Sequence, residues 1–349
     1  MTVTAVIVNY HTKSLLPDLL DNLGRDRFIS QIIIVDNSSE ITETDFSADY
    51  LHIIHNEENR GFGAAVNQAL AYANGEWILL MNPDSRFAKG GTEDLIAAAK
   101  KYETPLSGPR FYWDDDLMFR LPPAVGSCLW FDFASMCAGN FRLDSEIFSH
   151  YWNLRHQYFW TQKKPFFEPF LSGACLLIQK EWADSLGGRM FDERFFLYFE
   201  DTDLCLRAVL ENIRPVCVPE VSVVHYYDQA PSPDESKLNL MLKSRDLFIK
   251  KYYDTVQMPL LKGEGIQYPE LSVFEKPPVF SGWEKNQEEE LYFEMALSGF
   301  FVPFVQAFVK EDKIQLPPEI WKRLSPGQYF SRIRGDRSGV QQIWRWEKR

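Results

Sequence analysis

The chain has 349 residues, of which 45% are apolar, and this length predicts two structural units or one large α/β domain with an appendage. Its formal net charge of −12 argues against a general nucleic-acid binder, which would present a basic face. Five cysteines without CxxC spacing favour reduced, structural thiols over a disulfide framework or a zinc site.

The first hundred residues alternate between short, β-branched apolar runs and segments with helical periodicity. The apolar runs are Val3–Val8, Ile32–Val35 and Ile78–Met81, and the helical segments are Leu15–Leu23, Ala64–Ala73 and 93–102. Short buried strands that alternate with helices predict an α/β fold with a mostly parallel central sheet. Ligands bind beyond the carboxyl ends of such strands, so the polar residues that follow each strand are candidates for a site.

Regular elements are harder to assign after residue 104. Residues 105–170 are aromatic with weak periodicity, and we expect a strand or two and a variable insertion there. Further strands are expected at Leu176–Ile178, Val216–Val218 and Val221–Val224, and helices at Asp201–Leu210 and Leu238–Tyr253. Residues 257–278 have the composition of a linker, and residues 288–309 are expected to form one or two helices. We therefore predict a first domain over residues 1–256 and a mainly helical extension of unknown role over residues 257–349.

The residues that follow the first strands suit a nucleotide site. Tyr10 could stack on a base, and Asp36 could accept a hydrogen bond from a base or ribose, although Asp-Asn-Ser-Ser is also a good turn sequence. The first strand is not followed by GxGxxG, and the chain has no GxxxxGK[ST] loop, so a phosphate needs another partner. A divalent cation held by carboxylates is the usual one, with Asp84 as the candidate ligand or, alternatively, a turn residue. Arg60 could also meet a phosphate.

An acidic run, Glu200-Asp201-Thr202-Asp203, follows the aromatic stretch from Phe191 to Phe199. Clustered carboxylates beside apolar walls raise at least one pKa, which suits a general base. The alternative is an acidic helix N-terminus, since carboxylates are favourable in the first turn of a helix. Composition alone leaves the two interpretations equally open.

Four segments, in this order and spacing, closely resemble the family 2 inverting glycosyltransferases with a GT-A fold, and within them the bacterial rhamnosyltransferases. The segments are Val6-Ile-Val-Asn-Tyr10, Val35-Asp-Asn-Ser38, Asn59-Arg-Gly-Phe-Gly-Ala-Ala-Val-Asn67 and Leu80-Met-Asn-Pro-Asp84. The family's Asp-x-Asp motif stands here as Asn82-Pro83-Asp84, so an amide replaces the first carboxylate. The resemblance covers roughly residues 1–255 and divides them into a nucleotide-sugar-binding half (1–105) and an acceptor-binding half (106–256).

The resemblance implies a role for each matching residue. Asp201 matches the catalytic base, with Glu200 beside it, and Asp84 matches the ligand of a divalent cation, Mn²⁺ or Mg²⁺. A lone histidine is more often structural, but His225 follows a strand and matches the position of a second protein ligand to the cation. The expected nucleotide-sugar-binding residues are Asn9, Tyr10, Asp36, Asn59, Arg60, Asn67, Asn82 and Asp84, and the expected acceptor-binding residues are Ser172, Gly173 and Asp203.

The expected activity is therefore transfer of a sugar with inversion, rhamnose from dTDP-rhamnose, to a hydroxyl of a surface polysaccharide or lipid-linked glycan. Two alternatives stay open: the same mechanism with a UDP-sugar donor (galactofuranose or N-acetylglucosamine), and a catalytically silent glycan- or nucleotide-binding subunit. Without a basic leader or a run of about 18 uncharged apolar residues, the expected location is the cytoplasm. The basic, Trp-rich tail could contact anionic lipid, an anionic glycan or a partner subunit, or it could be a packed helical cap with a solvated face. A peripheral contact with the inner face of the membrane and a homo-oligomer are also left open.

Overall fold

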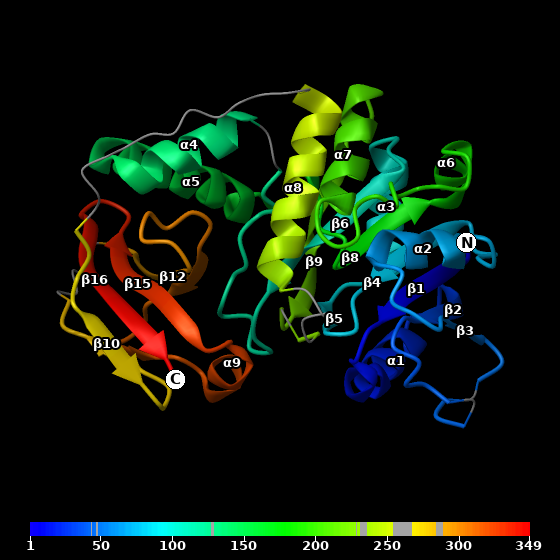
Figure 1. Cartoon of the computed structure of the whole chain (residues 1–349), viewed down its shortest axis with the longest axis horizontal. Helices are drawn as coiled ribbons and strands as arrows, with labels where there is room; N and C mark the ends of the chain where they lie inside the picture. Colours follow the sequence, from blue (N-terminus) through cyan, green and yellow to red (C-terminus); the bar gives the residue numbers. More distant parts are fainter. Residues whose placement is uncertain are drawn as a thin grey trace. The chain divides into compact units, whose positions relative to one another are not determined.

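The chain forms two compact units in a computed structural model that describes all residues except 43, 47, 127, 128, 228, 231–235, 254–266 and 284–288. Unit 1 comprises Met1–Arg110 and Gln162–Val256, and unit 2 comprises Phe111–Thr161 and Gln257–Arg349 (Figure 1). Each unit is therefore built from two separate stretches of the chain. Unit 2 includes residues 111–161, which the sequence analysis assigned to the acceptor-binding half.

Unit 1 is built on a nine-stranded sheet with the order β3-β2-β1-β4-β8-β6-β9-β5, and β7 pairs with β9. Its strands are β1 Val3–Asn9, β2 Ile29–Asp36, β3 Leu51–His55, β4 Trp77–Met81, β5 Ser85–Lys89, β6 Leu106–Tyr112, β7 Phe166–Phe167, β8 Cys175–Gln179 and β9 Val216–His225. The first four strands in the sheet order are parallel, whereas β4 pairs with β8, and β5 with β9, in antiparallel fashion. The carboxyl ends of β1, β2 and β4 thus meet at one edge.

Unit 1 also contains helices, several of which pack on this sheet. They are α1 Leu16–Gly24, α2 Phe62–Leu70, α3 Thr92–Lys101, α6 Lys180–Ser185, α7 Glu200–Leu210 and α8 Lys237–Tyr253, and a short 3₁₀ turn spans Lys13–Leu15. In α1 the buried side chains are Leu16, Leu19 and Leu23, at the three- and four-residue spacing of one helix face. All five residues of β4 are buried, as expected for a strand covered on both sides.

Unit 2 contains a five-stranded sheet with the order β10-β16-β15-β12-β13, and a two-stranded sheet of β11 and β14. The strands are β10 Leu271–Phe274, β11 Val279–Ser281, β12 Leu291–Ala296, β13 Val305–Phe308, β14 Lys313–Gln315, β15 Gly327–Gly335 and β16 Gly339–Lys348. Its helices are α4 Leu129–Asn140, α5 Arg142–Thr161 and α9 Pro318–Arg323. The helices α4 and α5 form a hairpin that packs on the sheet through Phe148 and Trp152 against Phe301, Phe304 and Phe330.

The prediction of a mainly helical C-terminal extension is wrong, because the described part of residues 257–349 consists of strands with one short helix. In β12, five of six residues are buried, so the strand lacks the alternation that distinguishes a strand from a helix. The aromatic tail is core rather than surface. Trp346 in β16 is fully buried and stacks on Tyr329, with ring centroids 4.8 Å apart.

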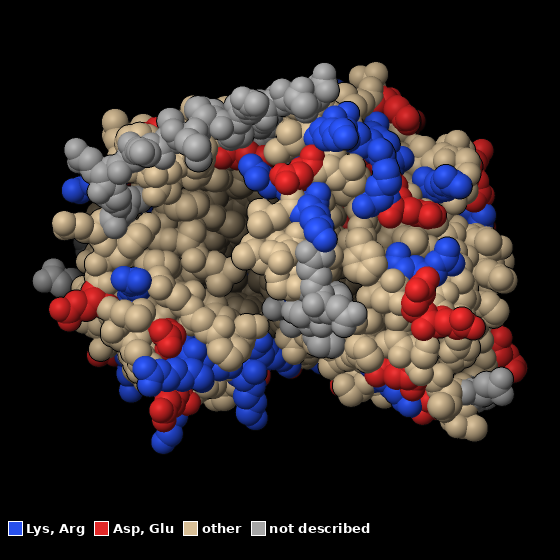
Figure 2. All heavy atoms as spheres, in the orientation of Figure 1, with Lys and Arg blue, Asp and Glu red and all other residues tan. Residues whose placement is uncertain are grey.

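The surface carries charges of both signs (Figure 2), and the described cysteines are buried. On the face that Figure 2 shows, acidic and basic side chains of the described residues lie interspersed. Cys137, Cys175, Cys205 and Cys217 are free and buried, in agreement with reduced structural thiols, and Cys128 lies outside the described residues. None of the helices in the described ranges is long and apolar enough to cross a bilayer.

Candidate active site

Asn9 and Asp36 lie side by side at the ends of β1 and β2, where the strand register pairs them. Asn9 Nδ2 donates a hydrogen bond to Asp36 Oδ1 at 3.0 Å, and the backbone N–H of Ile41 donates to Asp36 Oδ2 at 2.8 Å. Burial raises the pKa of Asp36, but hydrogen bonds from Ile41, Asn9 and Ser38 outweigh it and hold the pKa below its usual value. Asp36 is therefore a fully buried carboxylate that fixes the loop after β2.

Tyr10 and Arg60 are two of the predicted nucleotide-binding residues that retain exposed surface. Tyr10 is half-buried and lies edge-on to His11, with ring centroids 4.6 Å apart. Arg60 is exposed in the turn before α2. Both side chains are thus accessible to a ligand at the ends of β1 and β2.

Asn59 and Asn67 form hydrogen bonds with backbone groups. Asn59 Oδ1 accepts a hydrogen bond from the N–H of Gly61 at 2.9 Å. Asn67, buried in α2, donates from Nδ2 to the carbonyl of Phe191 at 2.8 Å and accepts from the Phe191 N–H at 3.0 Å. This two-point contact secures the start of the aromatic stretch that leads to Glu200 and Asp201.

Gly61 brings the same aromatic stretch against the start of α2. Its φ of +82° is in the left-handed region, and a Cβ there would lie 2.5 Å from the carbonyl oxygen of Phe196. The N–H of Phe62 donates to that same oxygen at 3.0 Å. The glycine is required both by its backbone conformation and by the close approach of the two segments.

Asp84 and His225 come together because β5 and β9 are antiparallel partners, with Ser85 opposite His225. His225 Nε2 lies 3.3 Å from Asp84 Oδ1, and the N–H of Tyr226 donates to the Asp84 carbonyl at 3.0 Å. Each of the two residues is 8% exposed. Burial raises the pKa of Asp84, whereas the charge of His225 and its hydrogen bond lower it, and the net effect is a lowered pKa.

These two side chains suit a divalent cation that also binds substrate. The described residues contain no group of three or more His, Cys, Asp or Glu side chains that could hold a metal ion. A carboxylate and an imidazole are nevertheless acceptable ligands for Mn²⁺, and cations of this kind commonly take their other ligands from phosphate oxygens and water. Asp84 and His225 fit such a partial ligand set.

Asp201 lies in the first turn of α7 and is anchored to the segment before β8. The N–H of Gly173 donates to Asp201 Oδ2 at 2.9 Å, and the N–H of Thr202 donates to Oδ1 at 2.7 Å. A Cβ on Gly173 would lie 3.4 Å from the Asp201 Cβ, which is ordinary van der Waals contact. Burial raises the pKa of Asp201 above its usual value, although these hydrogen bonds oppose the rise.

The two carboxylate clusters share one edge of the sheet through a short chain of contacts. Gly173 binds Asp201, and the next residue, Ala174, accepts a hydrogen bond from the N–H of Asn82 at 2.9 Å. Asn82 stands two positions before Asp84. Ser172 caps the same segment, because its Oγ accepts from the N–H of Ala174 at 3.2 Å. The structure therefore brings the predicted cation ligands and the predicted base to neighbouring positions.

Glu200 differs from Asp201 although the two are adjacent. Its side chain is 7% exposed, and Oε2 has no hydrogen-bond partner among the residues that the structure describes. Burial, with a contribution from the charge of Asp201, raises the pKa of Glu200 to about 8. Glu200 is thus a neutral acid at pH 7 while its neighbour is the more accessible carboxyl.

Asp203 has no exposed surface. It accepts hydrogen bonds from Arg207 Nε at 2.9 Å, from Lys251 Nζ at 2.6 Å and from the Tyr252 hydroxyl at 2.7 Å. The sequence does not indicate these three partners, because the contacts of Lys251 and Tyr252 depend on the packing of α8 against α7. The contacts of Asp203 join two helices and leave no oxygen facing an acceptor.

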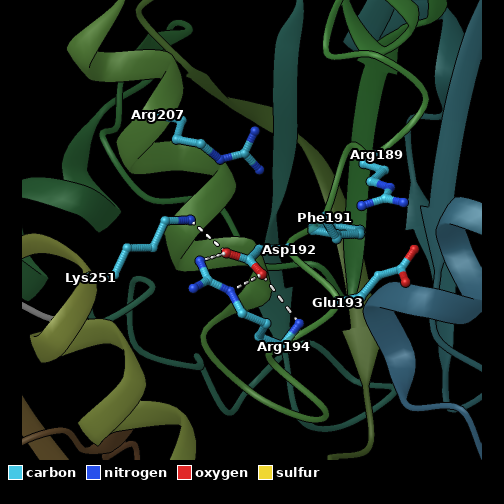
Figure 3. Close-up of a pocket in the computed structure, with 7 residues that line it drawn as sticks. All are labelled: Arg189, Phe191, Asp192, Glu193, Arg194, Arg207 and Lys251. Atoms are coloured by element: carbon cyan, nitrogen blue, oxygen red, sulfur yellow. Dashed lines mark hydrogen bonds and ion pairs between the residues drawn. The ribbon is translucent and has the colours of Figure 1, made fainter.

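A cavity of about 550 Å³ adjoins this network and is lined by Arg189, Phe191, Asp192, Glu193, Arg194, Arg207 and Lys251. Figure 3 shows Asp192 at its centre, between Lys251 and Arg194. Lys251 Nζ lies 2.9 Å from Asp192 Oδ2, and Arg194 binds the same carboxylate through Nε and Nη2. These pairs hold the pKa of Asp192 well below its usual range. The cavity contains none of the predicted catalytic or cation-binding residues.

Similarity to known proteins identifies the family of this chain. Residues 4–187, more than half of the chain, match the profile of Glycosyl transferase family 2, and the chain belongs to this family. It is therefore a glycosyltransferase that uses a nucleotide sugar, as the sequence motifs predicted.

Several curated proteins are similar over most of their length. The "Low-salt glycan biosynthesis hexosyltransferase Agl10" of Haloferax volcanii is 23% identical, over 80% of this chain and 81% of its own. The N-acetylglucosaminyl-diphospho-decaprenol L-rhamnosyltransferase of Mycobacterium tuberculosis is 25% identical, over 65% of this chain and 76% of its own. Rhamnosyltransferase WbbL of Escherichia coli is 24% identical, over 63% and 82%. The resemblance to rhamnosyltransferases is thus confirmed.

A solved structure, GalNAc-T7 with UDP, GalNAc and Mn²⁺, matches with a TM-score of 0.52 and 16% identity over 73% of this chain. The chain spans about half of that structure's length, 48%. At this identity the likeness shows the fold alone, and it confirms the GT-A architecture expected for unit 1.

Proposed function

We propose that this chain transfers rhamnose from dTDP-rhamnose, with inversion, to a hydroxyl of a surface polysaccharide or lipid-linked glycan. The donor proposal is supported by the Mycobacterium tuberculosis and Escherichia coli relatives, whose names specify rhamnosyl transfer. It is also supported by dTDP-rhamnosyl transferase RfbF of Shigella flexneri, which is 25% identical over 63% of this chain and 68% of its own. A lipid-linked acceptor is supported by the mycobacterial relative, whose name specifies a diphospho-decaprenol carrier. The nucleotide would lie over the ends of β1, β2 and β4, near Tyr10, Arg60 and Asp84.

The observation that carries the mechanism is the placement of Asp201. Two backbone N–H groups hold its carboxylate in one orientation at the sheet edge, and burial raises its pKa toward the range of an effective base. Asp201 would take the proton of the acceptor hydroxyl. The acceptor oxygen then forms a bond to the anomeric carbon as the bond to the diphosphate breaks on the opposite face, so the configuration inverts. Fixed geometry would supply much of the acceleration.

Asp84 and His225 would hold a divalent cation, Mn²⁺ or Mg²⁺, beside the donor diphosphate. When bound, this cation supplies positive charge where the leaving group develops negative charge. Asp84 and His225 contribute one carboxylate and one imidazole, and both are held in place by the pairing of β5 with β9. Ser172 and Gly173 would face the acceptor side, next to Asp201.

Purified protein assayed with Mn²⁺ against a panel of dTDP-rhamnose and UDP-sugars tests the donor. We expect release of dTDP and transfer from dTDP-rhamnose; transfer from a UDP-sugar alone would replace the donor assignment. Asp201→Asn tests the base, because it keeps the shape and removes the proton acceptor. We expect a loss of rate of roughly 100-fold or more. Asp246→Asn, an exposed carboxylate on α8, is the matched control. Equal transfer by the wild type and Asp201→Asn would refute the role of Asp201.

A further inference from the structure

One face of α8 contacts the aromatic stretch that precedes α7. Ser244 Oγ donates a hydrogen bond to the Leu197 carbonyl at 2.8 Å. One turn further along α8, the fully buried ring of Phe248 lies against the ring of Phe199, with centroids 5.5 Å apart. Lys251 follows three residues later. Positions i, i+4 and i+7 share one side of a helix, so Ser244, Phe248 and Lys251 form a single row along α8.

Lys251 joins two carboxylates that belong to different segments of unit 1. Its Nζ donates to Asp192 Oδ2 at 2.9 Å and to Asp203 Oδ1 at 2.6 Å. The side chains of Lys251 and Asp192 are 21% and 16% exposed, and that of Asp203 is fully buried. Figure 3 shows Lys251 extending from α8 toward Asp192. Removing one partner from a buried ion pair leaves the other charge uncompensated, so this bridge constrains the segments that it joins.

The two carboxylates lie on either side of the stretch that leads to Asp201. Asp192 is at its beginning, next to the residue whose backbone Asn67 holds. Asp203 is in the first turn of α7, two residues after Asp201. Lys251 therefore ties the beginning of the stretch to the helical turn that carries the proposed base.

We propose that Lys251 is a positioning residue for Asp201, because its two ion pairs set the place of the first turn of α7. The Asp201 carboxylate accepts a hydrogen bond from the N–H of Gly173 at 2.9 Å, and Gly173 belongs to the separate segment before β8. The two segments must therefore keep a fixed separation. A misplacement of about 1 Å between reacting groups can lower a rate roughly 100-fold. This inference rests on the proposed function, since it takes Asp201 as the base.

The donor side of the site is positioned by other contacts. The proposed cation ligands, Asp84 and His225, are held by the pairing of β5 with β9. Asn67 and Gly61 anchor the aromatic stretch on the side of α2, whether or not Lys251 is charged. Loss of the Lys251 bridge should therefore lower kcat and leave the KM for the donor little changed. A residue that serves stability alone would change the folded fraction and leave the kcat of each folded molecule as it is.

Kinetics of three α8 variants test the proposal. Lys251→Met keeps the length of the side chain and removes its charge, Lys251→Arg keeps the charge, and Lys250→Met changes an exposed neighbour as the matched control. Transfer from dTDP-rhamnose, or from the nucleotide sugar that the donor panel identifies, gives kcat and KM with Mn²⁺ present. Circular dichroism at the assay temperature gives the folded fraction.

We expect the kcat per folded molecule of Lys251→Met to fall about tenfold or more, with the donor KM within about twofold of the wild type. Lys251→Arg should retain about a third or more of the wild-type kcat, because a guanidinium can also donate to two carboxylates. Lys250→Met should match the wild type. If Lys251→Met is unfolded at the assay temperature, Asp192→Asn breaks the bridge at its other end and should lower kcat about threefold or more at unchanged KM.

The role of Lys251 would be overturned by equal kcat per folded molecule in Lys251→Met and Lys250→Met, or by a raised KM at unchanged kcat. Equal losses in Lys251→Arg and Lys251→Met would also overturn it, as would an unchanged kcat in Asp192→Asn where that variant is needed. Asp201→Asn, measured beside them, separates the two levels of the argument. If Asp201→Asn transfers sugar at the wild-type rate, the proposed function fails. If Asp201→Asn is inactive while Lys251→Met is fully active, only the role of Lys251 fails.

Discussion

Glu200 and Asp201 show how neighbouring carboxyl groups acquire different properties from their surroundings. Asp201 receives two backbone hydrogen bonds, whereas Glu200 Oε2 is buried without a partner among the described residues. The consequence for stability can be derived from the pKa of Glu200, which is raised from 4.5 to about 8. Between pH 4.5 and about 8, the folded protein keeps a proton on Glu200 that the unfolded chain loses. Rising pH therefore favours unfolding.

Glu200→Gln should therefore stabilise the protein at alkaline pH. The amide mimics the neutral acid and removes the ionisation that favours the unfolded chain. We expect the free energy of unfolding of the variant to exceed that of the wild type by about 2–4 kcal/mol near pH 8, and the difference to vanish near pH 4.5. Denaturant titrations at both pH values measure it. A difference that does not grow with pH would show that Glu200 is ionised in the folded state.

Asp84→Ala tests the cation site at the level of nucleotide binding. With one of two protein ligands removed, the cation should no longer link the protein to the diphosphate. Calorimetric titration of the wild type with dTDP should show affinity that falls roughly tenfold or more when EDTA replaces Mn²⁺. The variant should bind equally weakly in both conditions. Wild-type affinity in the variant with Mn²⁺ present would refute the assignment of Asp84.

The type of a residue predicts its role in the site less well than the contacts of its side chain do. The sequence motifs identified Asp84, His225, Gly173 and Asp201, and the structure places the first pair, and the second pair, in contact. Asp203 belongs to the same acidic run, but helical geometry turns it away toward Lys251 and Tyr252. Only the tertiary packing of α8, some fifty residues later, could have distinguished it from Asp201.

At the scale of elements, the segment from Phe191 to Phe199 positions both carboxyls of α7. It is held at its start by Asn67 and in its middle by Gly61, and the two residues before Glu200, Tyr198 and Phe199, have φ of 69° and 71°. Such conformations are costly for non-glycine residues and persist only where the surroundings enforce them. The surrounding contacts therefore fix the conformation of the segment from Phe191 to Phe199.

Gly61→Ala should disturb that conformation, and Gly188→Ala is its matched control. Both glycines have positive φ, +82° and +75°, but a Cβ at Gly188 meets nothing within 4 Å, whereas at Gly61 it would lie 2.5 Å from the Phe196 carbonyl. We expect each substitution to cost about 1 kcal/mol from the backbone. Gly61→Ala should cost about 1–3 kcal/mol more and lower the rate of transfer. Equal thermal stabilities and rates of the two variants would contradict this role of Gly61.

The strands and helices of the first hundred residues were predictable because each has one clear period. The same reasoning was weaker in unit 2 for a physical reason. The helix α5 buries one apolar face and exposes another, which blurs its helical period, and β12 is buried on nearly every residue, which removes its alternation. Patterns of burial predict an element only when one of its sides is polar.

At the scale of the whole molecule, unit 2 is completed by an excursion from within unit 1. Residues 111–161 contribute the α4–α5 hairpin, and residues 257–349 contribute the sheet on which it packs. No local pattern in the sequence predicts that these two stretches fold into one unit. Because these two stretches fold together, the predicted boundary near residue 256 does not by itself separate the two folded units.

Residues 111–161 leave unit 1 and return to it at neighbouring positions, so they can be removed and replaced by a short linker. Arg110 donates from Nη2 to the Gln162 carbonyl at 2.7 Å, so the two ends of the excursion lie close together in unit 1. A chain in which a short Gly-Ser linker replaces residues 111–161, and which ends at Val256, should fold and show a cooperative thermal transition. A chain merely truncated after Val256 should be less soluble, because the inner face of α5 loses Phe301, Phe304 and Phe330.

Circular dichroism melting and light scattering of the two shortened chains, beside the full chain, distinguish the outcomes. Removing both parts of unit 2 takes away its core as a whole and shortens the sheet of unit 1 only by the last two residues of β6. Removing one part leaves Phe148 and Trp152 without the side chains that bury them. If the truncated chain is as soluble as the doubly shortened one, the hairpin does not depend on the C-terminal sheet. If the doubly shortened chain fails to fold, unit 1 needs unit 2, and the two form a single cooperative unit.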